Sequence, residues 1–223
     1  MTRTDHYGHR QGYDRCGGRW GYWLDTYMHG VDTGNNYSTN SLVRVGRHIS
    51  DGKSWKALRG IIECNPLSLP ADATISSASL WVDVYSRTTS GATGPEDLTY
   101  RVTRCRRLDT DILVATWIKY NGGTWTIAGA CNTDDDIDRG VMDTYAGPDD
   151  TGWHEIDATN TVADAVANRA GEWLVVLETD EAETDGVGFD IYSVEATLAI
   201  HTPYLVVNWT LNGEEEGVDS ESG

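Results

Sequence analysis

Residues 69–86, LPADATISSASLWVDVYS, contain the clearest alternation of apolar and polar positions in the chain. From residue 78 onward the apolar positions are Ala78, Leu80, Val82 and Val84. The positions between them are Ser79, Trp81, Asp83 and Tyr85. Successive side chains of a strand point to opposite faces of a sheet, so this pattern predicts a half-buried strand with its Leu and Val side chains inward.

Ile75 has the opposite parity to this apolar set. A bulge or bend ahead of the strand would turn Ile75 back toward the core, and the polar lead LPADAT provides a loop that permits it. In the segment 54–64 we expect Leu58 and Ile62 to point inward as well.

Similar short runs, rich in Trp, Tyr, Val and Thr and separated by Gly, Asn and Asp, are typical of an all-β protein. We expect strands at residues 23–28, 41–47, 54–64, 73–86, 98–105, 153–159, 172–179, 187–193 and 203–211. One segment, residues 160–171, is predicted to be helical, with Asn160 or Thr161 as its N-cap and Gly171 as its stop. The predicted fold is therefore an all-β, antiparallel, jelly-roll-like sandwich with one short helix.

The 223 residues suffice for one domain with a full core. We expect an irregular N-terminal arm at residues 1–20, a sandwich at residues 21–211 and an acidic C-terminal tail at residues 212–223. The sequence contains no run of about 20 apolar residues, the length that a membrane-spanning helix needs. The first residues lack the apolar core of a secretory signal, so the sequence predicts no export by that route.

The formal net charge of −18 is unevenly distributed. Residues 1–111 contain 14 Lys and Arg against 12 Asp and Glu, a net charge of +2, whereas residues 112–223 contain 3 against 23, a net charge of −20. Such a field opposes binding to nucleic acid and favours solubility. Cys16, Cys64, Cys105 and Cys131 show no zinc-binding spacing, and free thiols are expected without export.

Five stretches, in order, resemble landmarks of DNRLRE domains, a β-sandwich family related to disaggregatase-associated repeats and to some carbohydrate-binding modules. They are DTYMHGVDTGNNYSTNSLVRVGR (25–47), LPADATISSASLWVDV (69–84), ATWIKYNGGTWTIAGA (115–130), GWHEIDATNTVADAVA (152–167) and TPYLVVNW (202–209). The chain departs from the family where Phe-Asp often precedes the Leu-Pro turn, and where a basic residue often follows Ser193.

The resemblance implies a jelly-roll-like sandwich in which the Leu-Pro lead is the turn between two antiparallel core strands. Domains of this family occur in secreted polysaccharide-degrading proteins, in adhesins and in structural proteins of bacteriophage virions. The resemblance therefore implies a fold and leaves several functions open.

The run TDDDIDRG places Asp134, Asp136 and Asp138 at alternate positions, as a calcium loop would. The positions that an EF-hand needs for Gly and Glu hold Arg139 and Tyr145, which excludes an EF-hand. A looser structural calcium site stays open, although a solvated acidic loop is favoured; otherwise we expect no cofactor. Two further acidic residues, Asp25 and Glu195, coincide with family landmarks and take part either in an ion site or in hydrogen bonds to loop backbone.

No phosphate loop, GxSxG or paired histidine motif is present, and no carboxylate pair stands out, so we expect no enzymatic activity. Aromatic residues are the remaining candidates for binding. Trp81, Tyr85 and Tyr120 are predicted as glycan-binding residues, because aromatic faces stack on sugar rings. For Trp117 and Trp125 we favour a place at one end of the core over an interface or glycan role.

These observations leave two alternative functions open. The first is a non-enzymatic structural protein of a bacteriophage virion surface, such as a capsid decoration subunit, assembled in the host cytoplasm. It would bind capsid or other virion proteins, or copies of itself, and neither nucleic acid nor membrane. The arm would supply the interface residues Arg3, Tyr7, Arg10, Tyr13, Arg15 and Trp20. The alternative is a secreted, extracellular carbohydrate-binding or adhesive module.

Overall fold

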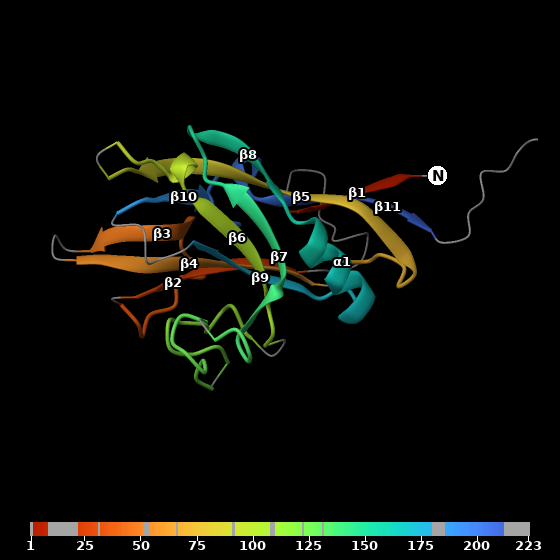
Figure 1. The fold of residues 1–223 in the computed structure, drawn as a ribbon, viewed down its shortest axis with the longest axis horizontal. Helices are drawn as coiled ribbons and strands as arrows, with labels where there is room; N and C mark the ends of the chain where they lie inside the picture. Colours follow the sequence, from red (N-terminus) through yellow and green to blue (C-terminus); the bar gives the residue numbers. More distant parts are fainter. Residues whose placement is uncertain are drawn as a thin grey trace, which may run out of the picture.

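The computed structural model describes residues 2–8, 22–30, 32–50, 54–65, 67–90, 92–107, 110–121, 123–130, 132–179 and 186–211. Within these residues eleven antiparallel strands form one strongly curled sheet whose two halves pack face to face (Figure 1). The predicted all-β sandwich with one α-helix is confirmed. In the part of the chain that is described, no helix combines the length and the hydropathy needed to cross a membrane.

The first half of the sheet is built around the long strand β5. Its strands are β1 (Arg3–Gly8), β11 (Tyr204–Leu211), β5 (Ala73–Thr88), β10 (Gly188–Tyr192), β3 (Leu42–Ser50) and β8 (Gly152–Asp157). On one edge β5 pairs first with β11 and then with β10, and on the other edge it pairs with β8. This half therefore presents one broad outer face.

The second half consists of β2 (Tyr22–His29), β4 (Ser54–Asn65), β9 (Trp173–Thr179), β6 (Thr99–Cys105) and β7 (Ile137–Ala146). Strand β4 connects the halves, because it pairs with β3 at its start and with β2 and β9 further along. Two 3-10 helices, η1 (Pro95–Asp97) and η2 (Ala199–His201), lie in the connections.

The main core confirms the predicted register of β5. Leu80, Val82 and Val84 are at most 2% exposed, and Leu58 and Ile62 of β4 are buried in the same cluster. The pairing of β5 with β11 shifts by one residue directly after Ile75, which lies opposite Trp209. This bulge returns Ile75 to the core side, where it packs against the main cluster, as its parity predicted.

A second hydrophobic core lies on the outer face of the second half. The described residues between 106 and 136 cover β4 and β9 there, on the side of the molecule away from β5 and β8 (Figure 1). The buried members of this core are Met28, Ile61, Cys105, Ile112, Ala115, Trp125, Ala130, Ile137, Leu174 and Val176. Strand β9 is buried along its whole length because both of its faces are covered.

This second core corrects the placement of the two tryptophans expected at one end of the sandwich. Trp125 is buried in the second core, where its indole Nε1 donates to the Thr116 carbonyl at 2.8 Å. Trp117 packs against the same cluster and is half-buried. Both residues belong to the covering segment rather than to the space between the sheets.

The helix α1 (Thr159–Asn168) lies across one end of the sandwich and buries Val162, Ala165 and Val166 in the main core (Figure 1). Its N-cap residue is Ala158, which corrects the predicted Asn160 or Thr161. The first backbone N–H groups are satisfied from another element instead. The Asp143 carboxylate on β7 accepts hydrogen bonds from the N–H groups of Asn160 and Thr161, at 2.9 and 3.0 Å.

We expect Asp143→Ala to lower the free energy of unfolding by about 1–2 kcal/mol, the usual cost of a lost N-cap. The Asp143 side chain is buried and negatively charged at the positive end of the helix. Urea denaturation would measure the change. Asp72→Ala is the matched control, because Asp72 is exposed in the turn before β5 and should cost less than about 0.5 kcal/mol. Equal losses in the two variants would contradict the capping role of Asp143.

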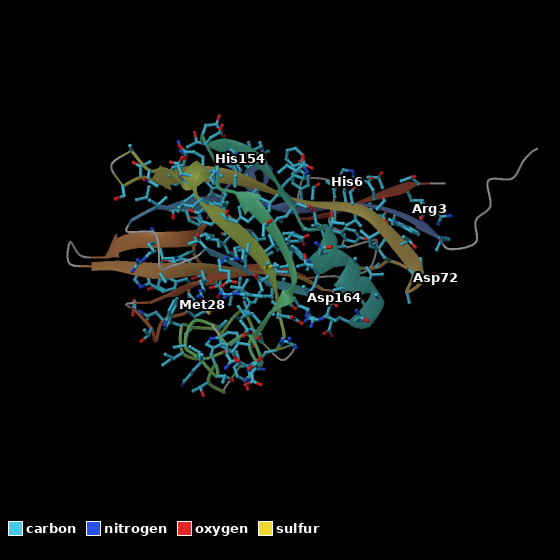
Figure 2. All side chains as sticks on the ribbon, viewed as in Figure 1. Arg3, His6, Met28, Asp72, His154 and Asp164 are labelled. Atoms are coloured by element: carbon cyan, nitrogen blue, oxygen red, sulfur yellow. The ribbon has the colours of Figure 1, made fainter. Side chains whose placement is uncertain are left out.

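The prediction of an irregular arm at residues 1–20 is wrong for residues 3–8, which belong to the sheet. Residues 3–8 form β1, which pairs with β11, and Figure 2 shows Arg3 and His6 along this strand. Tyr7 is fully buried in the main core, so it faces inward and not toward a neighbouring subunit. Strand β1 is fixed further by Trp209, whose Nε1 donates to Asp5 at 2.8 Å and whose ring lies 5.1 Å from the Arg3 guanidinium.

The remaining predicted interface residues lie outside the described residues. They are Arg10, Tyr13, Arg15 and Trp20. The acidic tail at residues 212–223 lies outside as well.

Two of the four cysteines lie in the described part of the chain, and both are buried. Cys64 belongs to the main core and Cys105 to the second core. The Cys105 Sγ lies 3.8 Å from the Thr110 hydroxyl, and burial raises the pKa of the Cys105 thiol to about 11. Cys105 is therefore a small apolar core residue at neutral pH rather than a reactive thiolate.

Candidate binding face

Aromatic side chains gather on the outer face of the first half of the sheet. We call this surface the outer aromatic face; its rings belong to Trp81, Tyr85, Trp153, Tyr192, His201 and Tyr204. They come from β5, β8, β10 and β11, which are grouped around β5 in Figure 1, and from the 3-10 helix η2. Each ring lies within 6.0 Å of another, so the rings form two connected groups.

The first group forms where β5 lies between β8 and β11. Trp81 is directly opposite Tyr204 in the sheet, and their rings are parallel to within 2° at a centroid distance of 6.0 Å. The Trp153 ring lies 5.3 Å from the Tyr204 ring. All three residues are half-buried.

The second group lies further along β5. Tyr85 is 53% exposed, and its ring meets the Tyr192 ring edge to face at 5.3 Å. The Tyr192 ring in turn stacks on the imidazole of His201 at 4.5 Å. These contacts hold the rings in place before any ligand is bound.

Polar side chains lie between and beside the two groups. His201 Nδ1 is 2.5 Å from the Oδ2 atom of Asp83, the β5 residue between Trp81 and Tyr85. Asp83 points to the outer side as predicted, yet it is only 6% exposed. On the other side of Trp81, the Ser79 hydroxyl donates to Glu155 at 2.5 Å. The face therefore combines flat apolar rings with groups that can hydrogen-bond a ligand.

The hollow beneath this face is small. The space bordered by Val82, Tyr145, His154 and Phe189 has a volume of about 30 Å³, room for about one water molecule. The outer aromatic face is thus a surface site, with no cavity of ligand size behind it at this place.

The structure brings together two of the three predicted glycan-binding residues. Trp81 and Tyr85 share the outer aromatic face, as their common parity on β5 predicted. Tyr120 lies in the segment that covers the second half of the sheet. Its ring is 5.3 Å from Trp125 and 4.6 Å from the guanidinium of Arg107.

Sequence reasoning missed the other rings of the face. In WHEID, Trp153 has the opposite parity to the buried Ile156, and in PYLVVNW, Tyr204 has the opposite parity to the buried Leu205. The alternation in each strand therefore indicated that the aromatic residue points outward. What the sequence did not reveal is that β11 places Tyr204 opposite Trp81 and that β8 places Trp153 opposite Asp83.

The three carboxylates predicted as a metal site do not converge. Asp136 is buried, and its oxygens accept hydrogen bonds from the N–H groups of Thr126 and Ile127 and from Arg107. Burial opposes ionisation of Asp136, but these hydrogen bonds outweigh it and hold the pKa of its carboxyl below the usual value. Asp136 therefore holds the loop around Thr126 and Ile127 in place.

The two neighbouring carboxylates are used differently. Asp138 forms ion pairs with Arg104 and Arg106, and Asp134 is exposed. Asp149, Asp150 and His154 do lie together, with ligand atoms within 4.8 Å of one another. There, His154 Nε2 lies 3.0 Å from a carboxylate oxygen of Asp150, and this contact between side chains four residues apart in the sequence accounts for the proximity.

Asp25 hydrogen-bonds to loop backbone, the second of the two roles considered for it. Its buried carboxyl accepts the Val194 N–H at 2.9 Å. Burial, aided by the nearby charge of Glu195 and opposed by the Val194 hydrogen bond, raises the pKa of Asp25 to about 7.

No family model matches the chain, and no curated protein matches it. The resemblance to DNRLRE domains therefore stays a prediction from the quoted motifs.

Proposed function

We propose that the protein is a non-catalytic binding module that holds a carbohydrate chain against the outer aromatic face. The observation that carries this proposal is the pair of ring groups on one outward face, with Asp83, His201 and Glu155 between and beside them. Exposed aromatic surface of this kind is typical of interaction sites.

The chemistry of the face matches that of a sugar. A pyranose ring has apolar C–H faces that pack on an aromatic ring and hydroxyl groups around its edge that need hydrogen-bond partners. Trp81 and Tyr204 supply parallel rings, and Ser79, Glu155 and His201 supply the polar groups. A surface site with only a small hollow behind it among the described residues accommodates a chain better than a small isolated molecule.

Nucleic acid bases also stack on aromatic side chains, but their phosphates need basic partners. The chain has a net charge of −18, and Asp83 and Glu155 place carboxylates on the face itself. The charge therefore favours a glycan over a single-stranded nucleic acid.

The setting in which the module works is a second part of the proposal. A virion-surface subunit stays the prediction from the sequence, and a secreted adhesive module is its alternative. Because residues 3–8 belong to the sandwich, docking through the arm would fall to residues 9–20. Glycan binding by the outer aromatic face is compatible with either setting.

We expect the purified protein to bind at least one soluble neutral polysaccharide from a panel of β-glucan, xylan and mannan in affinity electrophoresis. Trp81→Ala should weaken that binding about tenfold or more, because it removes a ring at the centre of the first group. Tyr120→Ala is the matched control on the opposite side of the molecule and should leave binding unchanged. Failure of the unmodified protein to bind any of the three, or equal losses in both variants, would contradict the proposal.

A further inference from the structure

We infer that the ligand of the outer aromatic face is an uncharged glycan, one of whose hydroxyl groups hydrogen-bonds to Nε2 of His201, with Asp83 positioning the imidazole. This inference rests on the proposed function. It specifies the class of the ligand and the polar contact through which the protein recognises that ligand.

The imidazole of His201 is held on two sides. Its Nδ1 lies 2.5 Å from Oδ2 of Asp83, and its ring stacks on Tyr192 at 4.5 Å with an interplanar angle of 24°. Asp83 is itself fixed, because it lies within β5 and is nearly buried. The side chain of His201 is 28% exposed, so the ring is both oriented and accessible.

The contact with Asp83 determines what the second ring nitrogen offers. A carboxylate accepts hydrogen bonds, so Nδ1 carries the proton that it donates to Asp83, and Nε2 of a neutral imidazole is left as an acceptor. Within the described residues Nε2 makes no hydrogen bond to the protein. A sugar hydroxyl that lies over the face can donate to it. Asp83 acts here as a positioning residue, in the way that carboxylates orient functional histidines elsewhere.

The carboxylates of the face select against anionic ligands. Across the sheet, Trp81 lies opposite Glu155, and Trp153 lies opposite Asp83, so each indole has a carboxylate beside it. At the outward positions of β5 from 77 to 85, of β8 from 153 to 157 and of β11 from 204 to 208, all of which the structure describes, there is no Lys or Arg. Arg44 on β3, next to β10, is itself paired with Asp190 at 3.7 Å. A uronate or sulfate group on the ligand would therefore meet the Asp83 and Glu155 carboxylates with no Lys or Arg at the surveyed positions.

The charge selection can be tested by isothermal titration calorimetry with the full chain. The probes are cellohexaose, xylohexaose and mannohexaose as neutral chains and hexagalacturonate as an anionic one. We expect at least one neutral probe to bind and hexagalacturonate to bind about tenfold more weakly or not at all. Glu155→Gln should narrow that difference. Equal or tighter binding of hexagalacturonate would overturn the inference.

The polar contact can be tested with two replacements of His201 and Asp83. His201→Phe retains a ring that can stack on Tyr192 but lacks Nε2, and we expect it to weaken binding of the neutral probe about tenfold. Asp83→Asn still offers an oxygen to Nδ1 and should lose less than Asp83→Leu. The double variant Asp83→Leu/His201→Phe should lose no more than His201→Phe alone, because both changes remove the same contact.

The outcomes separate this inference from the proposed function. Binding of a neutral probe that Trp81→Ala weakens but His201→Phe leaves unchanged would overturn the role of His201 and leave the aromatic face in place. Absence of binding by the unmodified protein would overturn both. Thermal unfolding of every variant shows whether a loss of binding reflects a loss of folding.

Discussion

Replacement of Glu178 by leucine is expected to lower the free energy of unfolding by about 3–5 kcal/mol, because it removes one partner of a buried ion pair. Glu178 lies in β9 and is 0% exposed. Its carboxylate accepts hydrogen bonds from Thr103 and Arg139, at 3.0–3.1 Å, and lies 3.8 Å from the Arg59 guanidinium. Arg59 is only 3% exposed and would keep a buried charge with less compensation.

Arg59 also connects the sheet to the segment that covers it. Its guanidinium donates to the Gly129 carbonyl at 2.6 Å and lies 5.8 Å from the Trp117 ring. We therefore expect Glu178→Leu to loosen the covering segment and the second core, in addition to destabilising β9.

Urea denaturation monitored by Trp fluorescence would measure these changes. Arg139→Ala is the companion variant: it removes two hydrogen bonds to the same carboxylate but leaves Arg59 and Thr103 in place, and because the Arg139 side chain is 42% exposed we expect a smaller loss of about 1–2 kcal/mol. The double variant Arg59→Met/Glu178→Leu should cost less than the sum of the two single changes. A loss for Glu178→Leu as small as that for Arg139→Ala would show that the burial of this carboxylate contributes little.

The strands that the sequence predicted are those that face the main core. Strand β5 was placed correctly, with its bulge, because Leu80, Val82 and Val84 alternate strictly with polar positions. Strands β1 and β7 were not predicted. Only Tyr7 in β1, and only Ile137 and Asp143 in β7, have buried side chains among the residues whose burial is described. Edge strands with so little buried surface leave no clear alternation in the sequence.

The second core shows a different limit. The segment WLVVLET in β9 reads as a continuous apolar run, which indicates burial on both faces but not what covers the second face. In the covering segment, the described residues between 106 and 136 form only isolated bridges and turns ahead of β7. Its position depends on single contacts such as Arg59 with Gly129, which have no local sequence signal.

The candidate site was predicted only in part, because the sequence pattern shows which residues share a face within one strand but not which strands pair. Trp81 and Tyr85 share a strand, so their parity placed them on one face. Trp153, Tyr192 and Tyr204 join that face only because β8, β10 and β11 pair with β5 in a given register. The cap of α1 is equally non-local, since Asp143 belongs to a different strand. Pairing between distant segments therefore determined what the sequence pattern left open.

Asp25→Asn is expected to make the stability of the protein less dependent on pH. Burial raises the pKa of Asp25 from 3.8 to about 7 in the folded protein, so the folded state binds this proton more tightly than the unfolded state does. The stabilisation from the neutral carboxyl is fully present below about pH 4, and it is lost as the pH rises toward 7. Above pH 7 the folded protein must hold a buried charge near Glu195.

The asparagine amide resembles the neutral carboxyl in shape, and its oxygen can still accept the Val194 N–H. At pH 8 we therefore expect Asp25→Asn to raise the free energy of unfolding by up to about 3–4 kcal/mol, and at pH 4 to leave it nearly unchanged or slightly lower. Urea denaturation at both pH values would measure this difference. Glu195→Gln is the companion variant: it removes the smaller charge effect while keeping Asp25, and should give a much smaller gain at pH 8. If Asp25→Asn destabilises the protein equally at pH 4 and pH 8, the buried carboxyl is ionised throughout that range.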